Sequence, residues 1–355
     1  MPRWLWRATL VVATAALLFA AAVAALSAAP GVPREGAIAT GAADTPSPPP
    51  LPPPPGTYAW SRPMILALGD SITEFAIHEG GWWRGFAGDY SRRADVLNRG
   101  LAGYSSDWAL AAADEAADAF SGRLAAVLIW FGANDAKTPG TGGPKQSVPL
   151  DEFGDNLRAI VRKFRKAAEE QPGKERRPRW PVPEQGAGGP VLVLVTPSPV
   201  HEQMWLNRLA TRAESEGQQA PQQSDRLNAR LAEYAEVVRR VAAEVAREGQ
   251  QQEGASAVAA GAASSSSMVM VADVHRAFVD AGADKGDDAA RRFFADGLHL
   301  SAEGSTLALG AIRMALAATP AAPDALPYHL PTYAQIDADD PGRTFGPLGA
   351  RGWGP

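Results

Sequence analysis

The sequence predicts a three-layer α/β sandwich, in which helices cover both faces of a five-stranded parallel sheet. Five short apolar runs rich in Val, Ile and Leu are spread along the chain, and helical apolar spacing recurs between them. Strands that alternate with helices are joined by right-handed crossovers, which produce a parallel sheet. A hydrophobic content of 46% in 355 residues is ample for the buried core that this fold requires.

The predicted strands are apolar segments of the length and composition typical of buried strands. They cover Met64–Leu68, Asp95–Asn98, Ala126–Phe131, Val191–Val195 and Met268–Val274. The first clear helix follows the candidate cap Asp151 and has apolar residues from Phe153 to Phe164.

The second clear helix has the same apolar spacing from Leu227 to Val245. Ser224 and Gly249 are its candidate start and stop signals. Three stretches outside the regular pattern are expected to be loop insertions, namely residues 172–190, 212–224 and 249–267.

The first 33 residues are expected to form a targeting or anchoring segment. Arg3 and Arg7 are followed by no charged residue until Arg34, a gap long enough for a membrane span or a signal peptide. A cleaved signal peptide and a retained anchor both fit, and either predicts an extracellular or membrane-anchored protein with a lumenal catalytic domain. Import into an organelle stays open as well, because the first acidic residue is Glu35.

The remaining boundaries follow from changes in composition. Residues 34–62 are expected to be a proline-rich linker, since "TPSPPPLPPPPG" favours a stiff polyproline II spacer. The folded domain is predicted at 63–318, and a Pro/Gly-rich tail follows at 319–355. The oligomeric state is not determined by these patterns.

Charge and cysteine content exclude several classes of function. A formal net charge of -5 lacks the basic surplus that nucleic-acid binding requires, so no nucleic-acid partner is expected. The absence of cysteine excludes disulfides, thiolate metal sites and a cysteine nucleophile. Covalent catalysis would therefore depend on oxygen or nitrogen.

Polar motifs come directly after each predicted strand or, for the last strand, after one further loop. Because ligands bind at the carboxyl ends of parallel strands, these motifs are expected to meet at one rim of the sheet. They are "GDS" (69–71), "NRGLAGYSS" (98–106), "GAND" (132–135), "TPSPVH" (196–201) and "DGLHLS" (296–301).

This set can supply every group that ester hydrolysis needs. Ser71 is the candidate nucleophile. His299 is the candidate base, and Asp296, three residues earlier, would orient it. The backbone N–H groups of Ser71 and Gly103 and the side-chain amide of Asn134 would form the oxyanion hole.

Other polar residues at the same rim are expected to support the site or line it. Asp70 and Asp135 are expected to accept hydrogen bonds from nearby backbone and hold the strand ends in shape. His201 and Trp205 are candidates for the wall of a substrate pocket.

The residues of these motifs and their order along the chain resemble those of a known family. With "GDSI", "GYS", "GAND" and "DGLH" in sequence, the chain resembles a GDSL or SGNH-type serine hydrolase over about residues 63–318. Longer strings such as "VLNRGLAGYSSDWA", "TPSPVHEQMW" and "SDRLN" resemble its isoamyl acetate-hydrolysing esterase branch. The resemblance implies a flavodoxin-like α/β/α fold, short-chain carboxylic esters as substrates, and no cofactor or metal.

Three alternatives are kept beside the short-chain esterase. A lipid- or carbohydrate-directed acyl hydrolase would use the same fold and site. A metallophosphoesterase would use the oxygen and imidazole groups of the rim as ligands, although only one histidine falls within the motifs. A membrane-tethered binding module without catalysis would need no intact set of catalytic groups.

Overall fold

The computed structural model describes most of the predicted folded domain. The described residues are 62–120, 123–141, 145–169, 189–260, 267–285, 287–326, 328, 336 and 339. The N-terminal segment, nearly all of the linker and most of the 172–190 insertion lie outside the described residues, so their assignments stay predictions. Within the described ranges, no helix combines the length and the hydrophobicity needed to cross a membrane.

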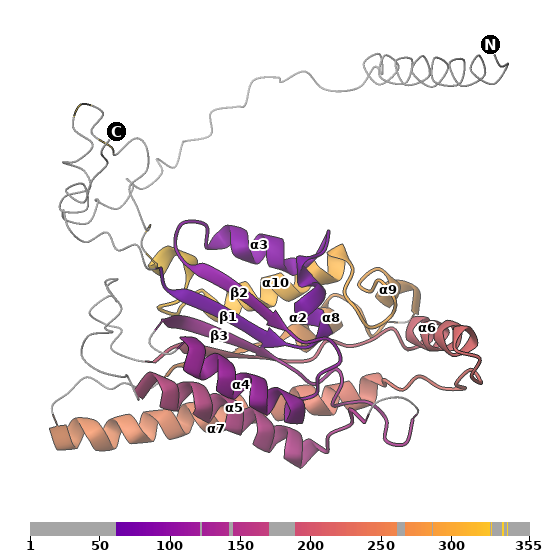
Figure 1. The fold of residues 1–355 in the computed structure, drawn as a ribbon, viewed down its shortest axis with the longest axis horizontal. Coiled ribbons are helices and arrows are strands. Elements are labelled where there is room, and N and C mark those ends of the chain that lie inside the picture. Colours follow the sequence, from indigo (N-terminus) through magenta and orange to yellow (C-terminus); the bar gives the residue numbers. More distant parts are fainter. Residues whose placement is uncertain are drawn as a thin grey trace, which may run out of the picture. The chain divides into compact units, whose positions relative to one another are not determined.

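The centre of the fold is a five-stranded sheet in which every neighbouring pair is parallel (Figure 1). The strand order β2-β1-β3-β4-β5 is the flavodoxin-like order, and it confirms the predicted architecture. The strands are β1 (Met64–Gly69), β2 (Asp95–Gly100), β3 (Leu124–Trp130), β4 (Val191–Val195) and β5 (Val269–Ala272).

Helices cover both faces of this sheet, as a parallel sheet requires. On one face lie α4 (Ser106–Phe120), α5 (Leu150–Glu169) and α7 (Asn228–Ala260), which pack side by side (Figure 1). On the other face α10 (Ala302–Leu316) packs against α3 (Trp82–Asp89) and α8 (Val274–Asp280).

Shorter elements connect these layers near the carboxyl ends of the strands, namely α2 (Ser71–Glu74), η1 (Phe75–Ile77), α6 (Glu202–Ser215) and α9 (Asp287–Arg291). A further short element, η3 (Pro323–Ala325), follows α10. The residues of β1 and β4 are buried along their whole length, which explains why their sequences are almost purely apolar.

The ends of several elements differ from those predicted, most clearly for β5 and α7. The last strand stops at Ala272, because Asp273 caps the next helix: its side chain accepts a hydrogen bond from the Arg276 N–H in the first turn of α8. Helix α7 continues through Gly249 to Ala260, since one glycine costs only about 1 kcal/mol in a helix. Part of the predicted 249–267 loop is therefore helical.

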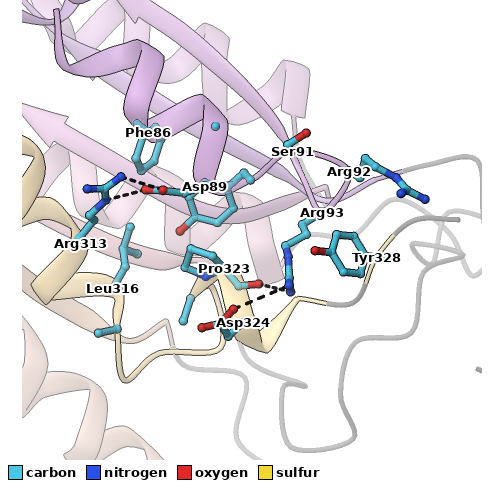
Figure 2. A pocket seen from close by; sticks show the side chains of 14 residues that line it. Phe86, Asp89, Ser91, Arg92, Arg93, Arg313, Leu316, Pro323, Asp324 and Tyr328 are labelled. Carbon is cyan, nitrogen blue, oxygen red and sulfur yellow. Dashed lines mark hydrogen bonds and ion pairs between the residues drawn. The ribbon is translucent and has the colours of Figure 1, made fainter. Parts of the chain in front are cut away.

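The first residues of the predicted tail pack against the domain. Tyr90 donates its hydroxyl to the Ala321 carbonyl at 2.8 Å, and Arg93 Nη1 lies 2.6 Å from the carbonyl oxygens of both Pro323 and Leu326. Figure 2 shows Arg93 between the Asp324 carboxylate and the ring of Tyr328. These contacts hold residues 319–326 against the end of α3.

The same contacts border a cavity of about 650 Å³, drawn in Figure 2. Its walls include Asp89 and Arg313, which form a salt bridge between α3 and α10 with N–O distances of 2.7 and 2.8 Å. None of the predicted site residues lines it. It lies near the residues that lead into β2, at the amino ends of the strands.

Replacing Arg93 with alanine should weaken the attachment of residues 319–326. Two hydrogen bonds from a charged donor are lost, so we expect the free energy of unfolding to fall by about 1–3 kcal/mol. Urea denaturation of the full chain measures this. The matched control is Arg84→Ala, an exposed position on α3, which should stay within about 0.5 kcal/mol of the wild type. Equal stability of the two variants would contradict the assignment.

Candidate active site

Ser71 lies where β1 ends and α2 begins. Asp70 caps this short helix, since its Oδ1 accepts a hydrogen bond from the Ile72 N–H at 2.9 Å. As the first residue of α2, Ser71 has an N–H with no partner inside the helix. The strand-to-helix junction therefore presents a hydroxyl and a backbone donor from the same residue.

His299 faces this serine. Its Nε2 lies 2.9 Å from Ser71 Oγ, and its Nδ1 lies 2.8 Å from Asp296 Oδ2. The two contacts form a continuous hydrogen-bonded series from carboxylate to imidazole to hydroxyl. This is the arrangement needed for a base to remove the hydroxyl proton while the carboxylate orients the ring.

The carboxylate of Asp296 is strongly held in its ionised form. Partial burial acts to raise its pKa, but the hydrogen bonds from the His299 ring and from the backbone of His299 and Leu298 outweigh burial and hold the pKa at about 2. Its Oδ1 accepts the Leu298 N–H at 3.0 Å and the His299 N–H at 2.9 Å. The loop therefore fixes the carboxylate that fixes the imidazole.

Gly297 allows this loop to pack closely on α6. Its φ is +101°, a conformation that strains other residues. A Cβ at this position would lie 2.3 Å from the backbone nitrogen of Trp205 and 2.8 Å from the His201 carbonyl oxygen. The Gly297 carbonyl also accepts the His201 N–H at 2.8 Å. The first turn of α6 thus supports the loop that carries His299.

Gly103 lies in the loop after β2, with a φ of +81°. Its carbonyl accepts a hydrogen bond from Gln146 Nε2 at 2.7 Å, and the preceding Ala102 N–H donates to Glu74 Oε2 at 2.6 Å. The bond to Glu74 holds the loop against α2, which begins with Ser71.

Asn134 follows β3, and its Nδ2 donates to the Tyr104 carbonyl at 2.9 Å. It is therefore tied to the residue after Gly103. Hydrogen bonds thus link Asn134 to the loop of Gly103, and that loop to Glu74 of α2.

Two side chains that the sequence reasoning missed bind the Asn134 carboxamide. Arg226 Nη2 donates to Asn134 Oδ1 at 3.0 Å, and Gln146 Nε2 lies 3.3 Å from the same oxygen. The string "SDRLN" containing Arg226 was part of the family resemblance, but no general pattern distinguishes a buried arginine after a loop from an exposed one.

Asp70 and Asp135 both accept hydrogen bonds from nearby backbone. Asp135 Oδ1 accepts the Ser106 N–H at 2.8 Å and its Oδ2 accepts the Gly132 N–H at 3.1 Å, which ties the end of β3 to the start of α4. Burial raises the pKa of Asp70 to about 7, partly opposed by the Ile72 N–H and increased by the charge of Asp135. Burial likewise raises the pKa of Asp135 to about 6.

The two candidate pocket residues have different surroundings. Trp205 packs edge-on beside His299, with ring centroids 6.2 Å apart, and Phe75 lies on the imidazole as well, at 5.3 Å. His201 is buried and accepts the Met204 N–H through Nδ1, so it caps α6. His201 also lines a separate cavity of about 450 Å³, together with His275 and Asn228.

The described residues contain no group of three or more His, Cys, Asp or Glu side chains arranged to hold a metal ion. The rim groups named for a metallophosphoesterase are Asp70, Asn134, Asp135, Asp296 and His299. Each of them already has a hydrogen-bond partner among the backbone groups or the other side chains of the site.

Replacing Asp70 with asparagine should change how stability depends on pH. A carboxyl group whose pKa rises on folding from 3.8 to about 7 makes the folded state progressively less favourable as pH rises through that interval. The neutral amide lacks this effect, so the stability of Asp70→Asn relative to the wild type should increase from pH 4 to 7 and then level off. The upper limit is about 1.4 kcal/mol per unit of pKa shift.

Urea denaturation of both proteins at a series of pH values measures this difference. The backbone bond from Ile72 is available to the asparagine oxygen as well, which limits the constant cost of the substitution. A stability difference that does not vary between pH 4 and 7 would show that Asp70 titrates normally.

Several known proteins are similar to this chain. The GDSL-like Lipase/Acylhydrolase family matches residues 67–307. A GDSL esterase/lipase of Arabidopsis thaliana is 27% identical over 285 residues, which cover 80% of this chain and 98% of the relative. An isoamyl acetate-hydrolyzing esterase 1 homolog of Bos taurus is 37% identical over 185 residues, 51% of this chain and 62% of the relative.

Among solved structures, an acetyl xylan esterase aligns with 71% of this chain and 99% of its own, at 15% identity and a TM-score of 0.46. The assignment rests instead on the family match, which includes the segments that carry Ser71, Gly103, Asn134, Asp296 and His299. The chain belongs to the GDSL-like lipase/acylhydrolase family and is a carboxylic ester hydrolase.

Proposed function

We propose that this protein hydrolyses esters of small molecules with Ser71 as nucleophile, His299 as general base and Asp296 as the group that orients His299. The observation that carries the proposal is the series of contacts from Asp296 Oδ2 to His299 Nδ1 at 2.8 Å and from His299 Nε2 to Ser71 Oγ at 2.9 Å. Ser71 lies near the start of the domain sequence, and Asp296 and His299 lie near its end, so the fold is what brings them together.

In the first half of the reaction, His299 Nε2 takes the Ser71 hydroxyl proton while Oγ attacks the ester carbonyl carbon. The carbonyl oxygen becomes an oxyanion, which accepts hydrogen bonds from the Ser71 and Gly103 N–H groups and from Asn134 Nδ2. The carbon–oxygen bond to the alcohol then breaks, and His299 gives its proton to the departing alcohol.

In the second half, water attacks the acyl-enzyme and passes a proton to His299. The bond between the acyl carbon and Ser71 Oγ breaks, Oγ regains a proton, and the carboxylic acid is released. Asp296 stays ionised throughout, as its low pKa requires, and stabilises the imidazolium formed in each half.

The proposed substrate class is short-chain, acetyl-type esters of apolar alcohols. His299 protonates the departing alcohol, so the alcohol lies beside the imidazole, where the Phe75 and Trp205 rings present apolar surface. The bovine relative is named for isoamyl acetate hydrolysis, and its similarity covers about half of this chain. Both observations favour a small apolar alcohol over a sugar.

Substitution of Ser71 by alanine should remove nearly all hydrolysis of p-nitrophenyl acetate by the full chain. The loss follows because the nucleophile is absent, while the circular dichroism spectrum should stay that of the wild type. Ser91→Ala, at an exposed position outside the site, is the matched control and should retain full activity. Wild-type turnover by Ser71→Ala would refute the proposed nucleophile.

The acyl-chain preference is tested with p-nitrophenyl esters from acetate to palmitate. We expect kcat/KM to be highest for chains of about two to six carbons, since the proposal assigns short acyl groups to the site. The Ser71→Ala protein serves as the blank for each ester. A preference for twelve carbons or more would favour the lipid-directed alternative, and preference for acetylated sugars over alkyl acetates would favour the carbohydrate-directed one.

A further inference from the structure

Arg226 is buried directly behind the proposed oxyanion hole. Its side chain is only 3% exposed, and it comes from the short segment that leads into α7. Its Nε donates to the Ala133 carbonyl at 2.6 Å, and its Nη2 donates to Asn134 Oδ1 at 3.0 Å. The guanidinium therefore binds both the backbone and the side chain of the "GAND" motif.

Asn134 can act on an oxyanion in only one of its two amide orientations. Its nitrogen must face the hole, because a carboxamide oxygen in that place would repel the negative charge. Rotation by 180° exchanges the oxygen and nitrogen within nearly the same volume, so shape alone does not select between them.

The surrounding hydrogen bonds select the productive orientation. Arg226 Nη2 is a donor only, and it faces Oδ1, while Nδ2 donates to the Tyr104 carbonyl at 2.9 Å. In the reversed amide, two donors would face each other at Arg226 and two acceptors at Tyr104. Nδ2 carries two hydrogens, so its second N–H stays available for the oxyanion.

Gln146 extends the same network. Its Oε1 accepts from Arg226 Nη2 at 3.3 Å, and its Nε2 lies 3.3 Å from Asn134 Oδ1 and 2.7 Å from the Gly103 carbonyl oxygen. Arg226 thus fixes the orientation of Gln146, which in turn holds the loop of Gly103. One guanidinium is connected to two of the three donors proposed for the oxyanion.

Asp225 compensates the charge of this buried arginine. Its Oδ2 lies 2.9 Å from Arg226 Nη1, and its Oδ1 accepts the Trp205 indole N–H at 2.7 Å. Burial acts to lower the pKa of Arg226, and the charges of Asp225, Asp70 and Asp135 act against it. An arginine side chain keeps its charge under such conditions, so it remains a donor at all working pH values.

We propose that Arg226 is a positioning residue of the oxyanion hole, which holds the Asn134 amide with its nitrogen toward the substrate. The proposal rests on the esterase function proposed above. Arg226 is then expected to affect the transition state and not substrate binding, because the oxyanion forms only as Ser71 attacks. Loss of Arg226 contacts should therefore lower kcat and leave KM nearly unchanged.

The test compares Arg226→Lys with Arg230→Lys in the full chain. Lysine keeps the charge for Asp225 but lacks the planar fork that reaches Ala133 and Asn134 together. Arg230 is a matched control, since it also donates to a carbonyl of this loop, that of Ala136 at 3.1 Å, and its other hydrogen bond is to the Tyr234 hydroxyl. With p-nitrophenyl acetate, we expect kcat of Arg226→Lys to fall about 10- to 100-fold and KM to change less than about threefold.

A double-mutant cycle shows whether the effect acts through the amide. Asn134→Ala alone should lower kcat about 10²- to 10³-fold, because one oxyanion donor is lost. In that background, Arg226→Lys should cost less than about threefold more, since there is no amide left to orient. Undiminished loss in the Asn134→Ala background would overturn the proposal, as would an Arg226→Lys protein that matches Arg230→Lys.

Folding is separated from positioning by titration of each variant with a fluorophosphonate, so that kcat is given per reactive serine. If Arg226→Lys does not fold, the neutral pair Asp225→Asn with Arg226→Gln replaces it, and the same loss of kcat is expected. Normal kcat per reactive serine in a poorly stable variant would mean a structural role only. Absence of both turnover and labelling in the wild type would instead refute the proposed function.

Discussion

The contact between Ser71 Oγ and His299 Nε2 requires two segments that lie far apart in the sequence to come within 2.9 Å of each other. The parallel sheet makes this possible, because β1 delivers Ser71 to its carboxyl edge and α10 begins just after the loop that carries His299. Close packing of Gly297 on the first turn of α6 then fixes the position of that loop. Each proposed catalytic group is thus attached to a rigid element.

Three ionisable side chains are buried beneath this rim. Asp70, Asp135 and Arg226 are all nearly inaccessible to solvent. Burial raises the pKa of the two carboxyl groups and acts to lower the pKa of the guanidinium, so in each case it favours the neutral form. Their hydrogen bonds lead to backbone at the ends of β1 and β3 and to the Asn134 amide. Such groups cost stability, and they are tolerated where they fix the direction of a polar group that would otherwise rotate.

The contacts of the C-terminal segment and the proposed catalytic groups lie at opposite ends of the strands. Tyr90 and Arg93 hold residues 319–326 near the amino ends of the strands, whereas the proposed catalytic groups lie at the carboxyl ends. The large cavity of Figure 2 belongs to the first edge. Its size reflects the packing of the C-terminal segment on α3 and α10, and its position shows that cavity volume alone is a poor guide to the site.

The sequence by itself determined the sheet, its five strands and the motifs that end them, because strand periodicity and turn chemistry are local properties. The places of Ser71, Gly103, Asn134, Asp296 and His299 in that order predict them as site residues. Only the tertiary structure decided that residues 319–326 pack on the domain, that α7 continues past Gly249, and that His201 lies behind the loop of Gly297. It also decided the role of Arg226, since burial and hydrogen-bond partners of a charged side chain depend on segments far away in the chain.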